Sequence, residues 1–274
     1  MSIDKHYDQA MEPERILQQV RSTYPEGASL FQLAPLDQLH IGGIKASTRL
    51  LRHLDSKRHR CILDIGSGAG GLMRQAAELG FPMIGLDITH AFNRLNRGLN
   101  HCLANRVSNP ILTGDAHQLP FADQSIDLIL FQHSFLNMPD NARVLAECRR
   151  VLAPGGQLVM HEVVAGPHPE RMRYPVPWAE DAAHSHLLPA AELQQQLQQA
   201  GFNHIETDDW SEEALSWRQR QREKEGSGQA ARAALSPTLI LGKRFKAMGE
   251  NLVFNLEHLA IRVVEVSAWQ DAPK

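Results

Sequence analysis

The feature that most constrains the fold is a short apolar run that breaks abruptly into glycines. Residues 61–65 read Cys-Ile-Leu-Asp-Ile, and four of the next six residues are glycine, at positions 66, 68, 70 and 71. Helix-compatible sequence follows at once over residues 72–79. A strand, a glycine-rich turn and a helix in this order are typical of a doubly wound sheet that binds a nucleotide-like ligand. Glycine suits the turn because the backbone must approach the ligand without an intervening Cβ atom.

Strand-like and helix-like segments alternate after this point. The predicted strands are residues 60–65, 82–87, 110–115, 125–131, 157–163, 203–208 and 260–268. The predicted helices after the glycine turn include residues 141–152, 190–200, 212–225 and 239–256, with a turn at 226–228. Pro154, Gly155 and Gly156 are expected to stop the first of these helices before the fifth strand. We therefore predict an α/β fold, a doubly wound and mostly parallel seven-stranded sheet with helices on both faces.

The chain is expected to form one domain in three parts. Residues 1–56 look helical and polar and are expected to form a lid, and residues 57–165 form a cofactor-binding core. Residues 166–274 complete the same domain. They begin with a proline-rich loop over the carboxyl edge of the sheet and continue with cap helices and the last strands. The helix at 239–256 can pack on the core or on a partner, so a homodimer is possible.

Bulk composition excludes several classes of function. The chain has 274 residues, 22% of them charged, and a net charge of −3, which gives no electrostatic footprint for nucleic acid or an anionic membrane surface. Its three cysteines show no metal-ligand spacing, its fourteen histidines include no H-E-x-x-H motif, and we expect no metal. We expect a cytoplasmic protein, because the N-terminus lacks an apolar signal core and no segment approaches 18 consecutive apolar residues.

Two acids at strand ends narrow the choice of ligand. Asp87 ends the second predicted strand, where a carboxylate can accept hydrogen bonds from both hydroxyls of a ribose. Asp115 ends the third, where it can accept from the exocyclic amine of adenine while the Ala116 N–H donates to the ring. Both aspartates are equally the residues that favour turns and helix N-caps. A ribose acid suits NAD and an adenosyl cofactor alike, and residues 66–71 literally match the dinucleotide pattern G-x-G-x-x-G.

The combined pattern resembles class I S-adenosylmethionine-dependent methyltransferases. The matching segments are residues 63–70, 85–87, 114–121, 125–127 and 150–156, in matching order and spacing over about 100 residues. The segment 36–43 with 46–48, together with Gln132, His133, Asn137, residues 174–179 and the C-terminal residues 241–257, is similar to sarcosine/dimethylglycine N-methyltransferase-like (methyltransferase type 11) proteins. The resemblance implies S-adenosylmethionine as cofactor. The cofactor contacts it implies are Asp64, Gly66, Ser67, Gly68, Gly70, Asp87, Ile88, Asp115, Ala116 and Gln132.

The expected reaction is methyl transfer to a small-molecule acceptor, most simply an amine such as a glycine derivative. O- or C-methylation of a phenol, quinone or other small metabolite is the first alternative. An NAD(P)-dependent oxidoreductase and a catalytically inactive cofactor-binding protein are further alternatives. Arg171 and Arg173, in the proline-rich loop, are candidates to bind the carboxylate of an amino-acid acceptor.

The acceptor is expected to meet the residues that follow the fourth strand, because its carboxyl end faces the cofactor methyl in this topology. His133 and Asn137 are therefore our candidates for the acceptor site, with His40 in the lid as a third. Tyr7 or Tyr24 are expected in the lid as well, and Trp178 offers a cation–π face. Each of the two histidines and the tryptophan also has an alternative interpretation as a packing or anchoring residue.

Overall fold

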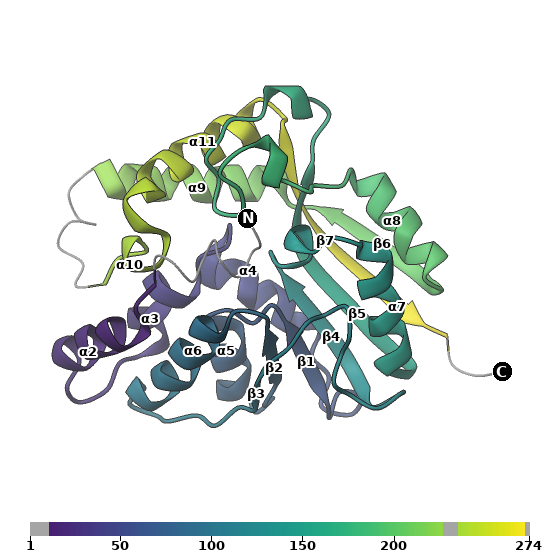
Figure 1. Ribbon diagram of the computed structural model, residues 1–274, viewed down its shortest axis with the longest axis horizontal. Coiled ribbons are helices and arrows are strands. Elements are labelled where there is room, and N and C mark those ends of the chain that lie inside the picture. The colour runs from purple at the N-terminus through teal and green to yellow at the C-terminus, as the bar shows by residue number, and fades with distance from the viewer. Residues whose placement is uncertain (1–10, 227–234, 272–274) are drawn as a thin grey trace.

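A single seven-stranded sheet forms the centre of the molecule (Figure 1). The computed structural model describes residues 11–226 and 235–271. The strands are β1 (Ile62–Ile65), β2 (Ile84–Asp87), β3 (Ile111–Thr113), β4 (Ile126–Gln132), β5 (Leu152–Ala165), β6 (Phe202–Asp209) and β7 (Ile261–Gln270). The main helices are α2 (Pro13–Thr23), α3 (Leu30–Asp37), α4 (Gly43–Leu50), α5 (Gly71–Glu78), α6 (His90–Cys102), α7 (Asn141–Val151), α8 (Ala190–Gln199), α9 (Ser211–Gly226), α10 (Thr238–Leu241) and α11 (Phe245–Glu257).

The strand order places a crevice beside the glycine turn. The order is β3-β2-β1-β4-β5-β7-β6, so the chain runs from β1 outward to β3 and then returns to β4 on the other side of β1. Strands β1 to β5 are parallel, and β7 is antiparallel to both β5 and β6. The carboxyl ends of β1 and β4 are therefore the point where the connections diverge, which is where open α/β sheets bind ligands.

The central strands are apolar on both faces because helices cover both faces. Leu63, Ile65 and their neighbours on one face pack in a cluster with α7 and α8. Ile62, on the other face of β1, packs in a cluster with α4 and α5. Successive side chains of a strand point to opposite faces, so a strand buried on both sides reads as a continuous apolar run. All four residues of β1 are buried, as this requires.

The predicted fold class is confirmed, and all seven strands lie where the sequence places them to within a few residues. Two predictions about local structure are wrong. Residues 154–156 are not a turn before β5 but lie within it, where a register shift against β4 between Ile126 and Leu128 accommodates them. The helix predicted at 239–256 is interrupted, because Gly242 takes a positive φ of 70° between α10 and α11.

The structure does not test two other expectations. Of the turn predicted at 226–228, only Gly226 belongs to the described residues. The three-part division at residues 56 and 165 stays a prediction. Within the described ranges, no helix combines the length and apolar character needed to cross a membrane.

The N-terminal helices are fixed to the core by a buried ion pair. Arg74 on α5 donates to Asp37 at the end of α3, with Nη2 and Oδ2 2.8 Å apart, and their side chains are 0% and 2% exposed. The same guanidinium also donates to Asn96 and Asn100 on α6. Helix α2 in turn packs against α6. One arginine therefore connects the N-terminal segment to two core helices.

Replacing Arg74 with alanine should lower the free energy of unfolding by about 3–5 kcal/mol, because the Asp37 carboxylate stays buried without its partner. Chemical denaturation measures the change. The matched control is Arg94→Ala, whose partner Glu14 is 69% exposed and which should cost no more than about 1 kcal/mol. Equal effects of the two variants would contradict a central role for the buried pair.

Candidate active site

A cavity of about 460 Å³ opens over the carboxyl ends of β1 and β4. Its wall comes from the glycine turn, the ends of β2 and β3, the residues after β4 and the segment between α3 and α4. Pro177, Trp178, His186 and Leu241 complete it. Of the thirteen site residues that the sequence predicts, twelve line this cavity: His40, Asp64, Gly66, Ser67, Gly68, Asp87, Ile88, Asp115, Ala116, Gln132, His133 and Asn137.

Gly70 is the predicted cofactor contact that does not line the cavity. It takes a positive φ of 84° before α5, and a Cβ there would lie 2.0 Å from Oδ1 of Asn96. Its glycine is therefore required by close packing against α6. The prediction assigned Gly70 to the cofactor because a run of glycines does not tell which of them face the ligand.

The glycine turn is compressed by neighbours from two other parts of the chain. A Cβ on Gly66, whose φ is 74°, would lie 2.3 Å from Cβ of Ser134, and one on Gly71 would lie 2.3 Å from the carbonyl oxygen of Asp37. A Cβ on Gly68 would meet nothing within 4 Å. The turn therefore presents bare backbone to the cavity and is held from behind by the residues after β4 and by the end of α3.

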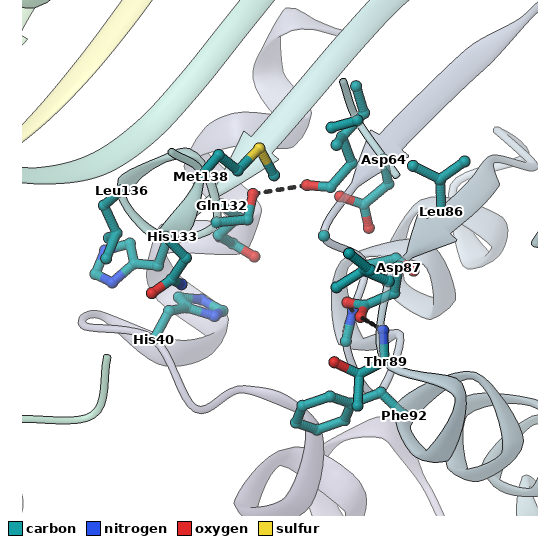
Figure 2. A pocket seen from close by; sticks show the side chains of 18 of the residues that line it. His40, Asp64, Leu86, Asp87, Thr89, Phe92, Gln132, His133, Leu136 and Met138 are labelled. Atoms are coloured by element: carbon teal, nitrogen blue, oxygen red, sulfur yellow. Dashed lines mark hydrogen bonds between the residues drawn. The ribbon is translucent and has the colours of Figure 1, made fainter. Parts of the chain in front are cut away.

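Asp87 connects the glycine turn to the start of α6. Its Oδ2 accepts from the Gly68 N–H at 2.9 Å and its Oδ1 from the Thr89 N–H at 2.8 Å (Figure 2). Burial raises the pKa of Asp87, and these hydrogen bonds oppose the shift. A carboxylate has about four acceptor sites, so acceptor capacity remains for a ligand beyond these two bonds. Asp87 can therefore stabilise the turn and bind a ligand at the same time, as the two interpretations of the sequence propose.

Asp64 and Asp115, the other two acids predicted to contact the cofactor, have pKa values shifted in opposite directions. Burial, together with the neighbouring Asp87, raises the pKa of Asp64 to about 7. Burial also acts to raise the pKa of Asp115, but hydrogen bonds from His117 outweigh it and hold the pKa below its ordinary value. Oδ1 of Asp115 accepts from the His117 N–H at 2.9 Å. Asp115 is therefore an ionised acceptor at the cavity, half-exposed where adenine is expected.

Three histidines gather on the opposite side of the cavity from Asp87. Figure 2 shows His40 and His133 close together beside Leu136. The ring of His133 stacks on that of His161 with centroids 5.0 Å apart, and its centroid lies 5.8 Å from that of His40. The sequence interpretation missed His161, which is fully buried on β5. The available signal was a polar pair, His161 and Glu162, within an apolar run, one strand away from the predicted acceptor residues.

All three imidazoles are neutral at neutral pH. Burial lowers the pKa of His40 to about 4 and that of His161 to about 3, and it places the pKa of His133 well below the usual range. Nε2 of His133 is buried and has no hydrogen-bond partner among the described residues. His40, by contrast, uses its Nε2, which lies 3.1 Å from the carbonyl oxygen of Gly43. Among the described residues, Nε2 is therefore paired in His40 and unpaired in His133.

A buried hydroxyl connects the N-terminal segment to the end of β4. Ser47 Oγ on α4 lies 2.7 Å from Oε1 of Gln38 and 3.1 Å from Oε1 of Gln132. It also lies 3.3 Å from Nε2 of His40. The α3–α4 segment is thereby held at the cavity wall through side chains from both sides.

Glu162 holds the loop after β4 in place through hydrogen bonds to its backbone. Its Oε1 accepts from the N–H groups of Ser134 and Phe135 at 2.8 and 2.9 Å, while Oε2 is buried without a partner among the described residues. Burial raises the pKa of Glu162 to about 7. This carboxyl group therefore sets the position of the residues that follow His133, and its protonated form fits its surroundings better than its charged form.

Four of the secondary candidates have clear positions. Arg171 and Arg173 do not line the cavity, and the Arg173 guanidinium lies 3.3 Å from the ring centroid of Phe254. Tyr24 packs with the helices of the N-terminal segment and does not line the cavity either. Trp178 does line it, and it also packs in an apolar cluster. Tyr7 lies outside the described residues.

Metal binding has no candidate in the described ranges, since no three His, Cys, Asp or Glu side chains there are arranged to hold an ion.

Comparison with known proteins shows which family the core of the chain is similar to. Residues 63–160 match the model of the family described as "Methyltransferase domain". Over these residues the chain is similar to methyltransferase domains. The match begins in β1 and ends in β5, so it covers the glycine turn, Asp87, Asp115 and His133. The remaining wall of the cavity comes from outside the matched segment.

The names of similar proteins give different methyl acceptors. The chain is 36% identical over 105 residues to a ubiquinone/menaquinone biosynthesis C-methyltransferase of Acidiphilium cryptum, covering 38% of this chain and 42% of the relative. It is 34% identical over 106 residues to a dimethylglycine N-methyltransferase of Parasynechococcus marenigrum, covering 38% of each. The chain thus spans less than half the length of either relative.

A solved structure extends the likeness in fold beyond the matched segment. The phosphoethanolamine N-methyltransferase 2 of Haemonchus contortus superposes with a TM-score of 0.67 at 18% identity. The superposition covers 92% of this chain and 59% of that one. At this identity it supports the fold and leaves the acceptor open.

The protein should lose stability as the pH rises from about 4.5 to about 7, through Glu162. The unfolded chain releases this proton near pH 4.5 and the folded chain near pH 7, so the folded state binds more protons in this window. Glu162→Gln mimics the protonated form and should gain about 3 kcal/mol of stability relative to wild type between pH 5 and pH 8. Denaturation curves at several pH values measure this, with the exposed Glu170→Gln as control. A difference that does not vary with pH would refute the role of Glu162.

Proposed function

We propose that this protein transfers a methyl group from S-adenosylmethionine to a small-molecule acceptor. The observation that carries the proposal is one cavity with two chemically different sides. One side holds the glycine turn, Asp87 and Asp115, which suit the polar groups of an adenosyl cofactor. The other side holds neutral imidazoles and apolar side chains. An apolar region next to a nucleoside site is what methyl transfer requires.

The residues of the first side fit the parts of the cofactor. Asp87 has acceptor capacity for the two ribose hydroxyls, and the ionised Asp115 for the exocyclic amine of adenine. Ser67 Oγ, in the glycine turn, and Asp37 Oδ1, beside it, are buried polar atoms without a partner among the described residues. A zwitterionic amino-acid group can satisfy both atoms. The donor and acceptor set is therefore complementary to S-adenosylmethionine along its whole length.

The chemistry asks little acid–base work of the protein. The bound cofactor supplies a methyl group activated by a sulfonium. The residues of this chain contribute by aligning the acceptor and by excluding water. The segment at residues 36–43 covers the cavity and is held by Ser47, and Gln132 lines the border between the two sides. A water-poor site also strengthens every polar contact made within it.

The finer assignment, N-methylation of an amine such as a glycine derivative, rests on similarity to the dimethylglycine enzyme. One observation favours the other candidate, O- or C-methylation of a phenol or quinone. Neither Arg171 nor Arg173 lines the cavity, so the foreseen carboxylate partners do not face the acceptor. Similarity to the quinone C-methyltransferase supports this second candidate.

Replacing Asp87 with alanine should weaken S-adenosylhomocysteine binding about ten- to a hundredfold, because a charge-assisted acceptor is worth roughly 1.5–3 kcal/mol. Isothermal titration calorimetry measures it. Asp181→Ala is a matched control, because Asp181 accepts from the N–H two residues later as Asp87 does, but on the surface. Unchanged affinity in the Asp87 variant would remove this residue from the cofactor site.

A further inference from the structure

The loop that follows β3 is fastened to helix α7 by polar contacts. We call residues 114–121 the post-β3 loop. Arg143 on α7 donates through Nε to the carbonyl oxygen of His117 at 3.0 Å. One turn further along the helix, Oε2 of Glu147 accepts from the Leu119 N–H at 2.8 Å. Residues four apart lie on the same face of a helix, so one face of α7 sets the position of the loop.

The side chain of His117 makes a second bridge, at the cavity wall. Its Nδ1 lies 2.6 Å from Oδ1 of Asp115, and its Nε2 is hydrogen-bonded to the carbonyl oxygen of Pro139. Pro139 belongs to the segment between β4 and α7, and all three residues line the cavity. The imidazole therefore joins two separate parts of the cavity wall, the end of β3 and the segment that follows β4.

Both partners of this imidazole are hydrogen-bond acceptors. A backbone carbonyl oxygen carries no hydrogen, and the lowered pKa of Asp115 keeps its carboxyl group ionised. A neutral imidazole has one N–H and one lone pair, so it can donate to only one of the two partners, whereas the imidazolium donates to both. Burial acts to lower the pKa of His117, but its hydrogen bonds to Pro139 and Asp115 outweigh burial and raise the pKa.

Two further charges that face this bridge come from the start of α7. Against the effect of burial, the negative charge of Asp140, which caps the helix, helps to raise the pKa of His117. Against the same effect, hydrogen bonds from His117 and the positive charge of Arg143 lower the pKa of Asp115. Both charges of α7 thereby stabilise the ionised pair of Asp115 with His117.

The bridge also fixes the direction of the Asp115 carboxylate. Its Oδ1 accepts from the backbone N–H of His117 at 2.9 Å and from the ring at 2.6 Å. The side chain of Asp115 is 52% exposed, and such a side chain loses rotational freedom when a ligand orders it. Prior ordering removes part of this cost. Held through Oδ1, the carboxylate leaves Oδ2 for a donor such as the exocyclic amine of adenine.

We propose that His117 is a positioning residue for the cofactor, which as an imidazolium joins Asp115 to the Pro139 carbonyl and so sets the adenine end of the cavity. The inference rests on the proposed function and concerns the same site. When the imidazolium releases its proton, one of its two bonds is lost and a lone pair faces an acceptor. Cofactor affinity should therefore fall as the pH rises above about 6.5, the ordinary pKa of histidine, and binding should in turn favour the protonated form.

Calorimetry with S-adenosylhomocysteine at about pH 6 and about pH 8.5 tests the proposal, since this range brackets the ordinary titration of histidine. The dissociation constant of the wild type should rise about three- to fivefold more over the range than that of His117→Asn or His117→Gln, as expected for one partly exposed charged pair. Asparagine retains a donor near the position of Nδ1 and glutamine near that of Nε2, and neither side chain titrates. The variants should therefore bind more weakly than wild type at the lower pH and approach it at the higher pH.

Comparison with the variants removes the contribution of other groups. Burial, together with Asp87, raises the pKa of Asp64 to about 7, so this acid ionises in the same range. Its ionisation favours the ammonium of the ligand, which is the opposite slope, and it is common to wild type and variants. The matched control is His184→Asn, because Nδ1 of His184 lies 2.8 Å from Oδ1 of Asp181 and neither residue lines the cavity. This variant should keep the full pH dependence of the wild type.

NMR of the histidine rings gives a readout that a merely structural role would not move. The Cε1–H signal that is missing from the His117→Asn spectrum should titrate in the free wild-type protein with a pKa above the ordinary value of about 6.5, because two acceptors face the ring. Saturating S-adenosylhomocysteine should raise this pKa further, by linkage. A pKa at or below the ordinary value overturns the proposal.

The calorimetric outcomes separate the role of His117 from the proposed function. No binding of S-adenosylhomocysteine by the wild type at either pH would defeat the proposed function. Binding with the same pH dependence in the wild type and in both His117 variants would leave the proposed function intact and defeat only the role of His117.

Discussion

The close packing of the glycine turn is the constraint on which the rest of the site depends. The turn is confined at its two ends, at Gly66 by Ser134 and at Gly71 by the carbonyl oxygen of Asp37, at distances that exclude a Cβ atom. Because of this packing, the loop after β4 and the N-terminal segment must meet at the end of β1. The cavity and its two chemically different sides follow from that meeting point.

The sequence predicted the sheet well because apolar runs that end in acids or glycines are local signals. It could not reveal which glycines face the ligand, since Gly70 is required by Asn96, a residue distant in the sequence. The interruption of the predicted 239–256 helix at Gly242 and the inclusion of residues 154–156 in β5 likewise depend on tertiary packing. His161 was missed because its relation to His133 arises only from the pairing of β4 with β5.

The electrostatics of the cavity follow from burial more than from ion pairs. The lining acids are on the side where ribose, adenine and the amino-acid group have polar hydrogens to offer, whereas the imidazoles opposite are held neutral by desolvation. Such a division suits a cofactor that is polar over most of its length and a reaction that disperses charge.

The most direct test of the central claim is a thermal-shift comparison of S-adenosylhomocysteine with NAD on the wild-type protein. A ligand that binds only the folded state stabilises it by RT ln(1 + [L]/Kd), so the midpoint keeps rising with the logarithm of the ligand concentration above Kd. The account predicts that S-adenosylhomocysteine raises the unfolding midpoint with this logarithmic concentration dependence and that NAD at the same concentrations does not. Stabilisation by NAD, without stabilisation by S-adenosylhomocysteine, would contradict it.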